Sequence, residues 1–371
     1  MCGVAVDETD DVYIVDRGHH RVRKVEGGNI DAYAGSGAQG FGGDDFDASV
    51  ADLDTPLAAA CLRDEVFIAD SVNHRVRKVD GAHDIHSHTG DGNNAHAGDT
   101  NHPATAARLN APGGLAYDRD NHVLYVADTG NHCVRRVDLR SGNIMLFAGD
   151  TNAGFGGDDN SAVAAQLDTP TDVAYDFKKD VLYICDQANH RIRAVSISSG
   201  EITTFAGDGN GAWAGDGGLP GVASFHTPAA IAVDGASNVY VATIGDHRVR
   251  KIEWDEGMDL FTVRAFAGIG MQGDAGDGGG AGAAQLDTPL GLAVDDAGAV
   301  YISCAPRARV RKVENGNITA LVGTGAAGFA GDGGAPLAGQ LSGPRGLAVD
   351  QAGRNLFIAD TVNRRVRRAV L

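Results

Sequence analysis

The chain has 371 residues, with 49 Asp and Glu against 31 Lys and Arg, and its formal net charge is −18. Hydrophobic residues make up 43% of it, enough apolar surface to compensate the ordering entropy of folding, so a wholly disordered chain is excluded. The negative charge repels phosphate backbones and anionic lipid, which disfavours nucleic acid as a partner unless a basic face is segregated from the acidic residues.

The first predicted elements lie at residues 3–35 and set the pattern for the whole chain. Four short runs rich in Val, Ile and Tyr follow one another there, reading GVAVD, VYIVD, RVRKV and IDAYAG. Such runs, joined by turns, predict an antiparallel meander of four strands. The chain begins MCGVAVDETD, without the features of a secretion signal, and we expect no membrane span because no segment approaches ~18 apolar residues.

The same runs recur along the chain at intervals longer than the ~40–50 residues of common propeller repeats. Further copies of the first run are AAACL at 58–62, which is degenerate, GLAYD at 114–118, DVAYD at 172–176, AIAVD at 230–234, and GLAVD at 291–295 and 346–350. Radial repetition of a meander predicts an all-β chain, a closed β-propeller in one domain. The approximate units are 1–54, 55–111, 112–169, 170–227, 228–288, 289–343 and 344–371.

Between the second and third runs the chain reads Asp-x-x-Asn-His-Arg, as at 70–75 and 186–191. Together with the Val-Arg-Lys-Val runs, this pattern resembles the NHL repeat family, and the resemblance implies a β-propeller, commonly six-bladed. Seven first, second and third runs are present but only six fourth runs, because Leu371 lies within the last third run.

We therefore predict seven antiparallel, four-stranded blades, except for a three-stranded last blade. Its exposed edge would be blunted by arginines, namely Arg364, Arg365, Arg367 and Arg368. A six-bladed ring, a truncated fragment and self-association through a strand donated by a neighbouring chain remain the alternatives.

One arginine occupies the third run of every unit: Arg23, Arg77, Arg135, Arg193, Arg250, Arg311 and Arg367. Repetition in every blade favours a structural role, because a catalytic centre needs one constellation only. A buried guanidinium needs acceptors, and the Asp that ends the second run is the expected partner. Thr243 and Cys304 replace that Asp in two units.

Histidines also recur, at His20, His74, His132, His190 and His247. We interpret them as turn residues, because one His per blade cannot converge on a single metal ion. A local zinc or copper site among His83, His86, His88, His96, His102 and His122 is a weaker alternative, since their spacing fits no tetrahedral pattern. Cys2, Cys61, Cys133, Cys185 and Cys304 lack metal spacing and are predicted to be buried free thiols.

Each long connection between blades contains a Gly-Asp pair, at Asp44, Asp99, Asp158, Asp216, Asp277 and Asp332, and a proline follows further on. Asp beside Gly suits a tight turn, which is the structural interpretation. The functional alternative is a set of calcium ligands, because carboxylates in flexible Gly-rich loops suit Ca²⁺. Loop aromatics such as Phe41, Trp213 and Phe329 are expected to anchor the loops, and the insertion around Trp254 could mark a partner site.

The sequence contains no evident nucleophile with its base and no set of three metal ligands. We therefore predict a non-catalytic interaction or ligand-binding propeller. It would present its Gly- and Asp-rich loop face to a protein, glycan or small ligand, with calcium as a possible cofactor. Two alternatives stay open, namely a metal-dependent hydrolase or lyase with its site at the channel mouth, and a structural subunit that assembles through its incomplete last blade.

Overall fold

A computed structural model describes residues 3–26, 29–295, 297–350, 353–363 and 365–371. The fold is all-β and of the seven-bladed propeller class, with antiparallel sheets of four, five, five, five, four, four and three strands in chain order. The expectation of seven blades with a three-stranded last blade is confirmed, and the six-bladed alternative is wrong. The helices of the described residues are single 3-10 turns, and none is long and apolar enough to cross a bilayer.

The chain divides into two compact units, residues 1–184 with 195–203, and residues 185–194 with 204–371. The division passes through the fourth sheet. Strand bounds in the first three sheets are as follows: β1 (Val4–Val6), β2 (Val12–Asp16), β3 (Arg21–Glu26) and β4 (Asn29–Ala34); β5 (Phe46–Asp47), β6 (Pro56–Leu62), β7 (Glu65–Asp70), β8 (Arg75–Val79) and β9 (Asp84–Thr89); β10 (His102–Pro103), β11 (Pro112–Asp118), β12 (Val123–Asp128), β13 (Cys133–Asp138) and β14 (Asn143–Ala148).

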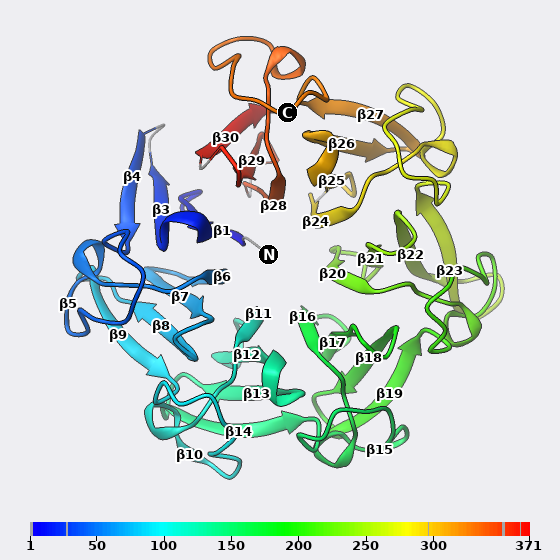
Figure 1. Cartoon of the computed structure of the whole chain (residues 1–371). Helices are drawn as coiled ribbons and strands as arrows, with labels where there is room; N and C mark the ends of the chain where they lie inside the picture. Colours follow the sequence, from blue (N-terminus) through cyan, green and yellow to red (C-terminus); the bar gives the residue numbers. More distant parts are fainter. Residues whose placement is uncertain (1–2, 27–28, 296, 351–352, 364) are drawn as a thin grey trace. The chain divides into compact units, whose positions relative to one another are not determined.

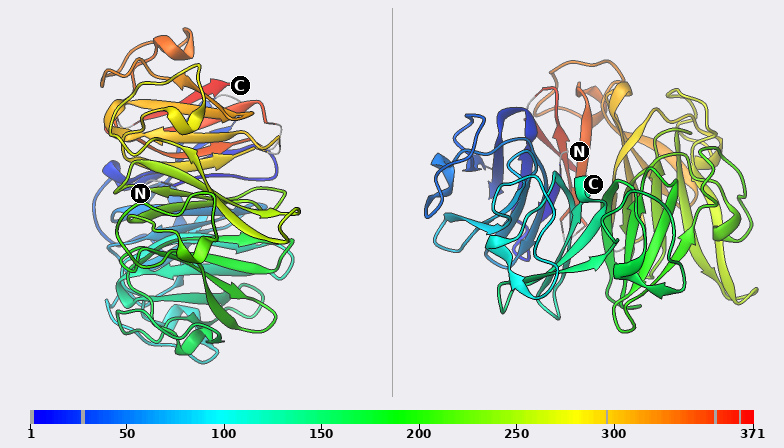
Figure 2. Two further views of the ribbon diagram at one scale, coloured as in Figure 1. Left: turned by 90° about the vertical axis from the view of Figure 1, so that its right-hand side faces the viewer. Right: turned by 60° about the horizontal axis from the view of Figure 1, so that its bottom comes forward.

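The remaining sheets repeat this order (Figure 1). Their strands are β15 (Asn160–Ser161), β16 (Pro170–Asp176), β17 (Val181–Asp186), β18 (Arg191–Ser196) and β19 (Glu201–Ala206); β20 (Pro228–Val233), β21 (Val239–Thr243), β22 (Arg248–Asp255) and β23 (Leu260–Ala267); β24 (Pro289–Val294), β25 (Val300–Cys304), β26 (Arg309–Glu314) and β27 (Asn317–Val322); β28 (Pro344–Val349), β29 (Asn355–Asp360) and β30 (Arg365–Val370). Both views in Figure 2 show a ribbon of strands and loops with short helical turns only.

The long connection before each blade explains why the repeat exceeds the common propeller length. In the second blade it first adds the short strand β5 beside the outer strand β9, and only then continues to the inner strand β6. β10 and β15 do the same for β14 and β19. The sequence did not predict this fifth strand. It pairs with the outer edge, which an exposed meander would otherwise leave open to association.

Apolar residues of neighbouring blades form shared clusters within each unit. In the first unit, Val134 and Ala148 of the third blade belong to one buried cluster with Leu182 and Ile202 of the fourth. In the second unit, Ala242 and Val249 of the fifth blade cluster with Ile302 of the sixth. Because successive strand residues face opposite sides of a sheet, a blade can bury apolar side chains on both of its faces, and these clusters join neighbouring blades within each unit.

The edge arginines of the last sheet only partly match the prediction. Arg367 does not blunt the edge, since it is buried and its Nε lies 2.7 Å from an Asp332 carboxylate oxygen, and Arg368 is exposed. Arg364 lies outside the described residues, as does the side chain of Arg365. Position 367 turns inward because side chains alternate along a strand, so every second residue of β30 faces the core.

Candidate functional site

The recurring arginine fixes the long loop to its blade. Arg77 of β8 has a fully buried side chain and forms ion pairs with Asp44 of the loop and with Asp70 at the end of β7. Asp70 also accepts hydrogen bonds from the Asp54 amide at 2.7 Å and from the Asn73 side chain at 2.8 Å. Burial raises the pKa of Asp70 to about 6, although these donors and Arg77 act in the opposite direction. The network therefore confirms the structural role predicted for Arg77.

The same pairing recurs in other blades. The carboxylate at the end of the second strand lies near the arginine in the pairs Asp16–Arg23 (2.9 Å), Asp128–Arg135 (3.5 Å), Asp186–Arg193 (3.4 Å) and Asp360–Arg367 (3.8 Å). In the blades where Thr243 and Cys304 replace this Asp, the loop carboxylate still holds the arginine. Arg250 lies 2.6 Å from Asp216, and Arg311 lies 2.7 Å from Asp277.

The structure explains both residues of the Gly-Asp pair, because the glycine is required by steric constraints and the aspartate by its ion pair with arginine. Gly215 has φ +87°, and a Cβ there would lie 2.7 Å from the Ala223 Cα. Only glycine meets both conditions, because other residues rarely adopt this backbone and the space is already filled. The turn then directs Asp216 toward Arg250, and Gly43 with Asp44 repeats the arrangement, at φ +78° and 2.7 Å from the Ala51 Cα.

The six aspartates predicted as calcium ligands each belong to a different loop. At least five lie against an arginine: Asp44 with Arg77, Asp99 with Arg135 at 3.6 Å, Asp216 with Arg250, Asp277 with Arg311, and Asp332 with Arg367. The backbone carbonyl of Asp158 accepts a hydrogen bond from the Asn160 side-chain amide at 2.9 Å. Calcium at these carboxylates stays a prediction, and where an arginine lies against the carboxylate, a guanidinium already supplies the positive charge.

The hairpin histidines lie in turns, as predicted, and the five of them also connect their blades to the next blade along the chain. His74 has φ +54°, and its Nδ1 accepts a hydrogen bond from the Ala111 amide, just before the next blade, at 3.2 Å. Burial lowers the pKa of His74, which favours the neutral ring that this bond requires. Equivalent bonds join His20 to Thr55, His132 to Thr169, His190 to Thr227 and His247 to Thr288.

Some of the extra histidines pair with carboxylates. His86 lies 2.8 Å from Asp45 and 3.1 Å from Asp80, and His96 lies 2.9 Å from Asp99. In the part of the chain that the structure describes, no three or more His, Cys, Asp and Glu side chains are arranged to hold a metal ion. Cys133, Cys185 and Cys304 are buried free thiols as predicted, Cys61 is half-buried, and Cys2 lies outside the described residues.

The loop aromatics pack on arginine side chains, which confirms that they anchor the loops. The Arg75 guanidinium lies 4.0 Å from the centre of the Phe41 ring, and that of Arg248 lies 3.9 Å from the centre of the Trp213 ring. Phe41 and Trp213 nevertheless remain 46% and 47% exposed, so each is also accessible to solvent.

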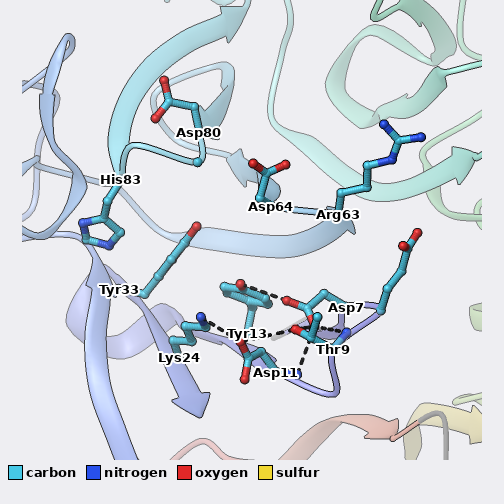
Figure 3. A pocket seen from close by; sticks show the side chains of 12 residues that line it. Asp7, Thr9, Asp11, Tyr13, Lys24, Tyr33, Arg63, Asp64, Asp80 and His83 are labelled. Carbon is cyan, nitrogen blue, oxygen red and sulfur yellow. Dashed lines mark hydrogen bonds and ion pairs between the residues drawn. The ribbon is translucent and has the colours of Figure 1, made fainter.

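A pocket of about 400 Å³ departs from the repeated architecture. It lies in the first unit, between the turn of β1 and β2 and the hairpins of the second blade (Figure 3). Its buried floor contains Tyr13, Tyr33 and Asp7. The remaining lining residues are Glu8, Thr9, Asp11, Lys24, Arg63, Asp64, Asp80, Gly81 and His83.

The floor of the pocket is held in place by its own contacts. The Tyr13 hydroxyl donates to Asp7 Oδ2 at 3.1 Å, and the Tyr13 and Tyr33 rings meet edge to face with centres 4.8 Å apart. His83 contacts the other side of Tyr33, at 4.9 Å between ring centres. Burial raises the pKa of Tyr13 well above its ordinary value, and the nearby Tyr33 hydroxyl and Asp7 carboxylate act in the same direction, so the Tyr13 phenol stays protonated.

Negative charge predominates on the walls. Lys24 is neutralised by Asp11 at 2.8 Å and Glu26 at 2.9 Å, and Figure 3 shows the Arg63 guanidinium directed away from Tyr33. Asp64 is exposed at the rim and forms no hydrogen bond or ion pair with the described residues. The pocket therefore combines aromatic rings with an available carboxylate, an arrangement suited to a cation.

Sequence reasoning did not find this pocket, although a signal was present. The pocket lies beside the second unit, whose first run is the degenerate copy AAACL. In this run Leu62 replaces the Asp that ends the first run of the other units. In the first, fifth and sixth blades that Asp accepts a hydrogen bond from a tyrosine hydroxyl, as Asp7 does from Tyr13. In the second blade Leu62 replaces the Asp and Phe67 replaces the tyrosine, so this hydrogen bond is lost. The local departure from the repeat marks the site.

Comparison with known proteins identifies the family of this fold. A model of the NHL repeat matches residues 3–25 and 109–137, which contain the first three strands of one blade and most of those of another. With the seven blades and their Asn-His hairpins, the match places the chain among the NHL-repeat β-propellers.

Two relatives are similar over most of the chain. The chloroplastic protein SUPPRESSOR OF QUENCHING 1 of Arabidopsis thaliana is 31% identical over 282 residues, 70% of this chain and 25% of that protein. Human NHL repeat-containing protein 2 is 25% identical over 351 residues, 82% of this chain and 45% of that protein. The chain thus spans a quarter to less than half of these relatives.

A solved structure shares the fold. Catalytically inactive virginiamycin B lyase from Staphylococcus aureus, crystallised with quinupristin, aligns with a TM-score of 0.63 over 100% of this chain and 94% of that one. The two sequences are 12% identical, so the likeness concerns the fold alone.

Proposed function

We propose that this NHL-repeat propeller is a non-catalytic binding module whose pocket in the first unit receives a positively charged group. The group would be an ammonium or guanidinium, carried by a small ligand or by a side chain of a partner protein. The observation that carries the proposal is that the exposed Asp64 carboxylate and the Tyr13 and Tyr33 rings line the same pocket, of about 400 Å³. A pocket of this volume accommodates a small ligand.

Charge and ring geometry act together at this site. A cation over a tyrosine face gains about 0.5–2 kcal/mol. The Lys24 ammonium already lies 5.8 Å from the centre of the Tyr13 ring, so a ligand cation would compete with Lys24 for that ring. A nearby exposed carboxylate adds up to about 1 kcal/mol. The hydrolase or lyase alternative needs a reactive constellation, and the described residues contain no group of three or more His, Cys, Asp and Glu fit to hold a metal. A binding role therefore has the better support.

Calorimetric titration tests the proposal with N-acetyl-lysine methylamide and its uncharged norleucine counterpart. The lysine derivative should bind more tightly, and Asp64→Asn should weaken its binding about two- to fivefold, the range for one exposed charge pair. Asp120→Asn is the matched control, because Asp120 is an exposed carboxylate on the equivalent hairpin of the third blade. Equal affinity for the two derivatives, or no change in Asp64→Asn, would contradict the proposal.

The loop surface is a second candidate, for a protein or glycan partner. Apolar side chains of several 3-10 turns are exposed to solvent, as Val50 (63%), Val222 (64%) and Leu337 (53%) are. Clustered exposed apolar residues mark interaction surfaces. Trp213→Ser serves in the same titration series. If it abolishes binding while Asp64→Asn leaves it intact, the ligand site belongs to this loop surface.

A further inference from the structure

The pocket in the first unit already holds a positive charge of its own. The Lys24 ammonium lies 5.8 Å from the centre of the Tyr13 ring, 2.8 Å from Asp11 and 2.9 Å from Glu26. Lys24 and Tyr13 are cross-strand partners on β3 and β2, and Figure 3 shows the Lys24 side chain beside Tyr13 and Asp11. Burial lowers the pKa of Lys24, but its hydrogen bonds to the two carboxylates outweigh this effect and raise the pKa, so the side chain stays charged.

A lysine above a tyrosine ring is part of the repeat. In the fifth blade Lys251 lies 5.8 Å from the centre of the Tyr240 ring, and in the sixth blade Lys312 lies 5.9 Å from the centre of the Tyr301 ring. In both blades the glutamate two residues after the lysine neutralises it, at 2.5 Å and 2.9 Å. A lysine with one such carboxylate partner is therefore a structural feature of the blade.

Asp11 departs from this repeat. The equivalent positions hold Asn238 in the fifth blade and Ala299 in the sixth. Among the described residues, only the first of these three lysines therefore has two carboxylate partners. Asp11 lines the pocket, whereas Glu26 lies outside it and is 69% exposed. Lys24 is thus held by one carboxylate inside the pocket and by another in solvent.

This arrangement allows Lys24 to release one partner and keep the other. Its ammonium has three donors on a flexible four-carbon stem, so it can stay with Glu26 while its bond to Asp11 is exchanged. A ligand ammonium that takes its place at Asp11 restores the ion pair there and gains the Tyr13 ring. Because each exposed ion pair contributes little, the exchange costs little.

We propose that Lys24 is an internal competitor that occupies the cation position of the pocket, and that a ligand ammonium displaces it from Asp11 and Tyr13 while Lys24 keeps its ion pair with Glu26. The inference rests on the proposed function of the pocket. It identifies Asp11, in addition to Asp64, as a carboxylate that determines the specificity for a cation.

Calorimetric titration of the whole chain with N-acetyl-lysine methylamide tests the proposal. Lys24→Met should bind the derivative about three- to tenfold more tightly than the parent chain, because the competing charge is gone while the apolar stem remains. Lys24→Arg keeps the positive charge and should bind no more tightly than the parent chain. Lys251→Met is the matched control, because it removes the same charge from the equivalent position of the fifth blade and should leave the affinity unchanged.

A double variant separates the contact with Asp11 from a general effect of charge. Lys24→Met combined with Asp11→Asn carries the asparagine of the fifth blade at this position and should lose the gain, because the ligand then lacks the carboxylate that Lys24 released. Thermal unfolding first establishes that each variant is folded. A gain that persists in the double variant, or that Lys251→Met reproduces, overturns the proposal.

The remaining outcomes distinguish this inference from the proposed function. If the parent chain prefers the lysine derivative to its norleucine counterpart and Lys24→Met shows no gain, the role of Lys24 is overturned and the proposed function stands. Binding by Lys24→Met alone would support Lys24 as the occupant and contradict the proposed function, because the pocket of the parent chain would then be closed to ligands. No preference in either protein overturns both.

Discussion

At the scale of single residues, the recurring arginine contributes more than its ion pairs. Arg250 is fully buried, donates to the Ser224 and Ala214 carbonyls at 2.9 and 3.1 Å, and lies 2.6 Å from Asp216. Arg250 therefore binds two backbone carbonyls of the loop and neutralises one loop carboxylate. A buried guanidinium of this kind stabilises the loop, which accounts for its recurrence in every blade.

Arg250→Met should destabilise the protein by about 3 kcal/mol, because the apolar stem remains while a carboxylate and two carbonyls lose their donor. Denaturant unfolding measures the loss. Arg264→Met, on the adjacent strand, is the control, since Arg264 is 56% exposed and its pairs with Glu253 and Asp255 contribute less than about 1 kcal/mol. Equal losses in the two variants would mean that the buried network is not stabilising.

His88 offers a pH-dependent test of a second residue. Burial, with a smaller effect of Lys78, lowers the pKa of His88 to about 4. A folded pKa below the unfolded value of about 6.5 gives stability that is complete above pH 6.5 and is lost as the pH falls toward 4. Phe147, Phe205 and Phe266 occupy the same register in other blades, so phenylalanine fits there.

His88→Phe should therefore flatten the acid side of the stability profile. Between pH 7.5 and 5 the parent chain should lose about 2 kcal/mol that the variant retains. His86→Asn is the control with the opposite sign. Hydrogen bonds to Asp45 and Asp80 raise the pKa of His86, so its contribution is present at low pH and is lost as the pH rises through the folded value. Parallel profiles for all three proteins would contradict this account.

At the scale of the elements, the sequence predicts the strands that recur in every blade but not the pairing of short strands that lie far apart in the sequence. Alternating apolar runs locate the inner three strands of each blade, and the Asp70–Arg77 pair follows from their fixed spacing. The pairing of β5 with β9 does not, because two residues, Phe46 and Asp47, carry no strand pattern of their own. Their position depends on a loop fixed by Gly43 and Asp44, a tertiary effect.

The candidate pocket shows the same limit in another form. Tyr13 and Tyr33 read as ordinary members of their strands, and nothing in their spacing predicts an accessible surface between them. Only the replacement of an Asp by Leu62 in the next blade distinguishes the site, and the consequence of that change depends on which side chains surround it in space. A departure from the repeat can therefore indicate the position of a site, but the chemistry of that site depends on the surrounding side chains, which only the structure gives.

At the scale of the whole molecule, the distribution of positive charge matters as much as its sum. The chain has 31 Lys and Arg against 49 Asp and Glu, and the recurring third-strand arginines are engaged with carboxylates. Binding to a phosphate backbone depends on basic side chains that are free to release counterions. The architecture uses much of its positive charge internally.

We therefore expect no binding of single-stranded RNA or duplex DNA at about 150 mM salt, the condition at which counterion release limits weak electrostatic binding. Fluorescence anisotropy with labelled 20-mers of mixed sequence measures it. The net charge of −18 should instead produce repulsion, so lowering the salt should not generate a saturable complex. Saturable binding whose affinity falls steeply with rising salt would require a segregated basic face, and the charge argument would then be wrong.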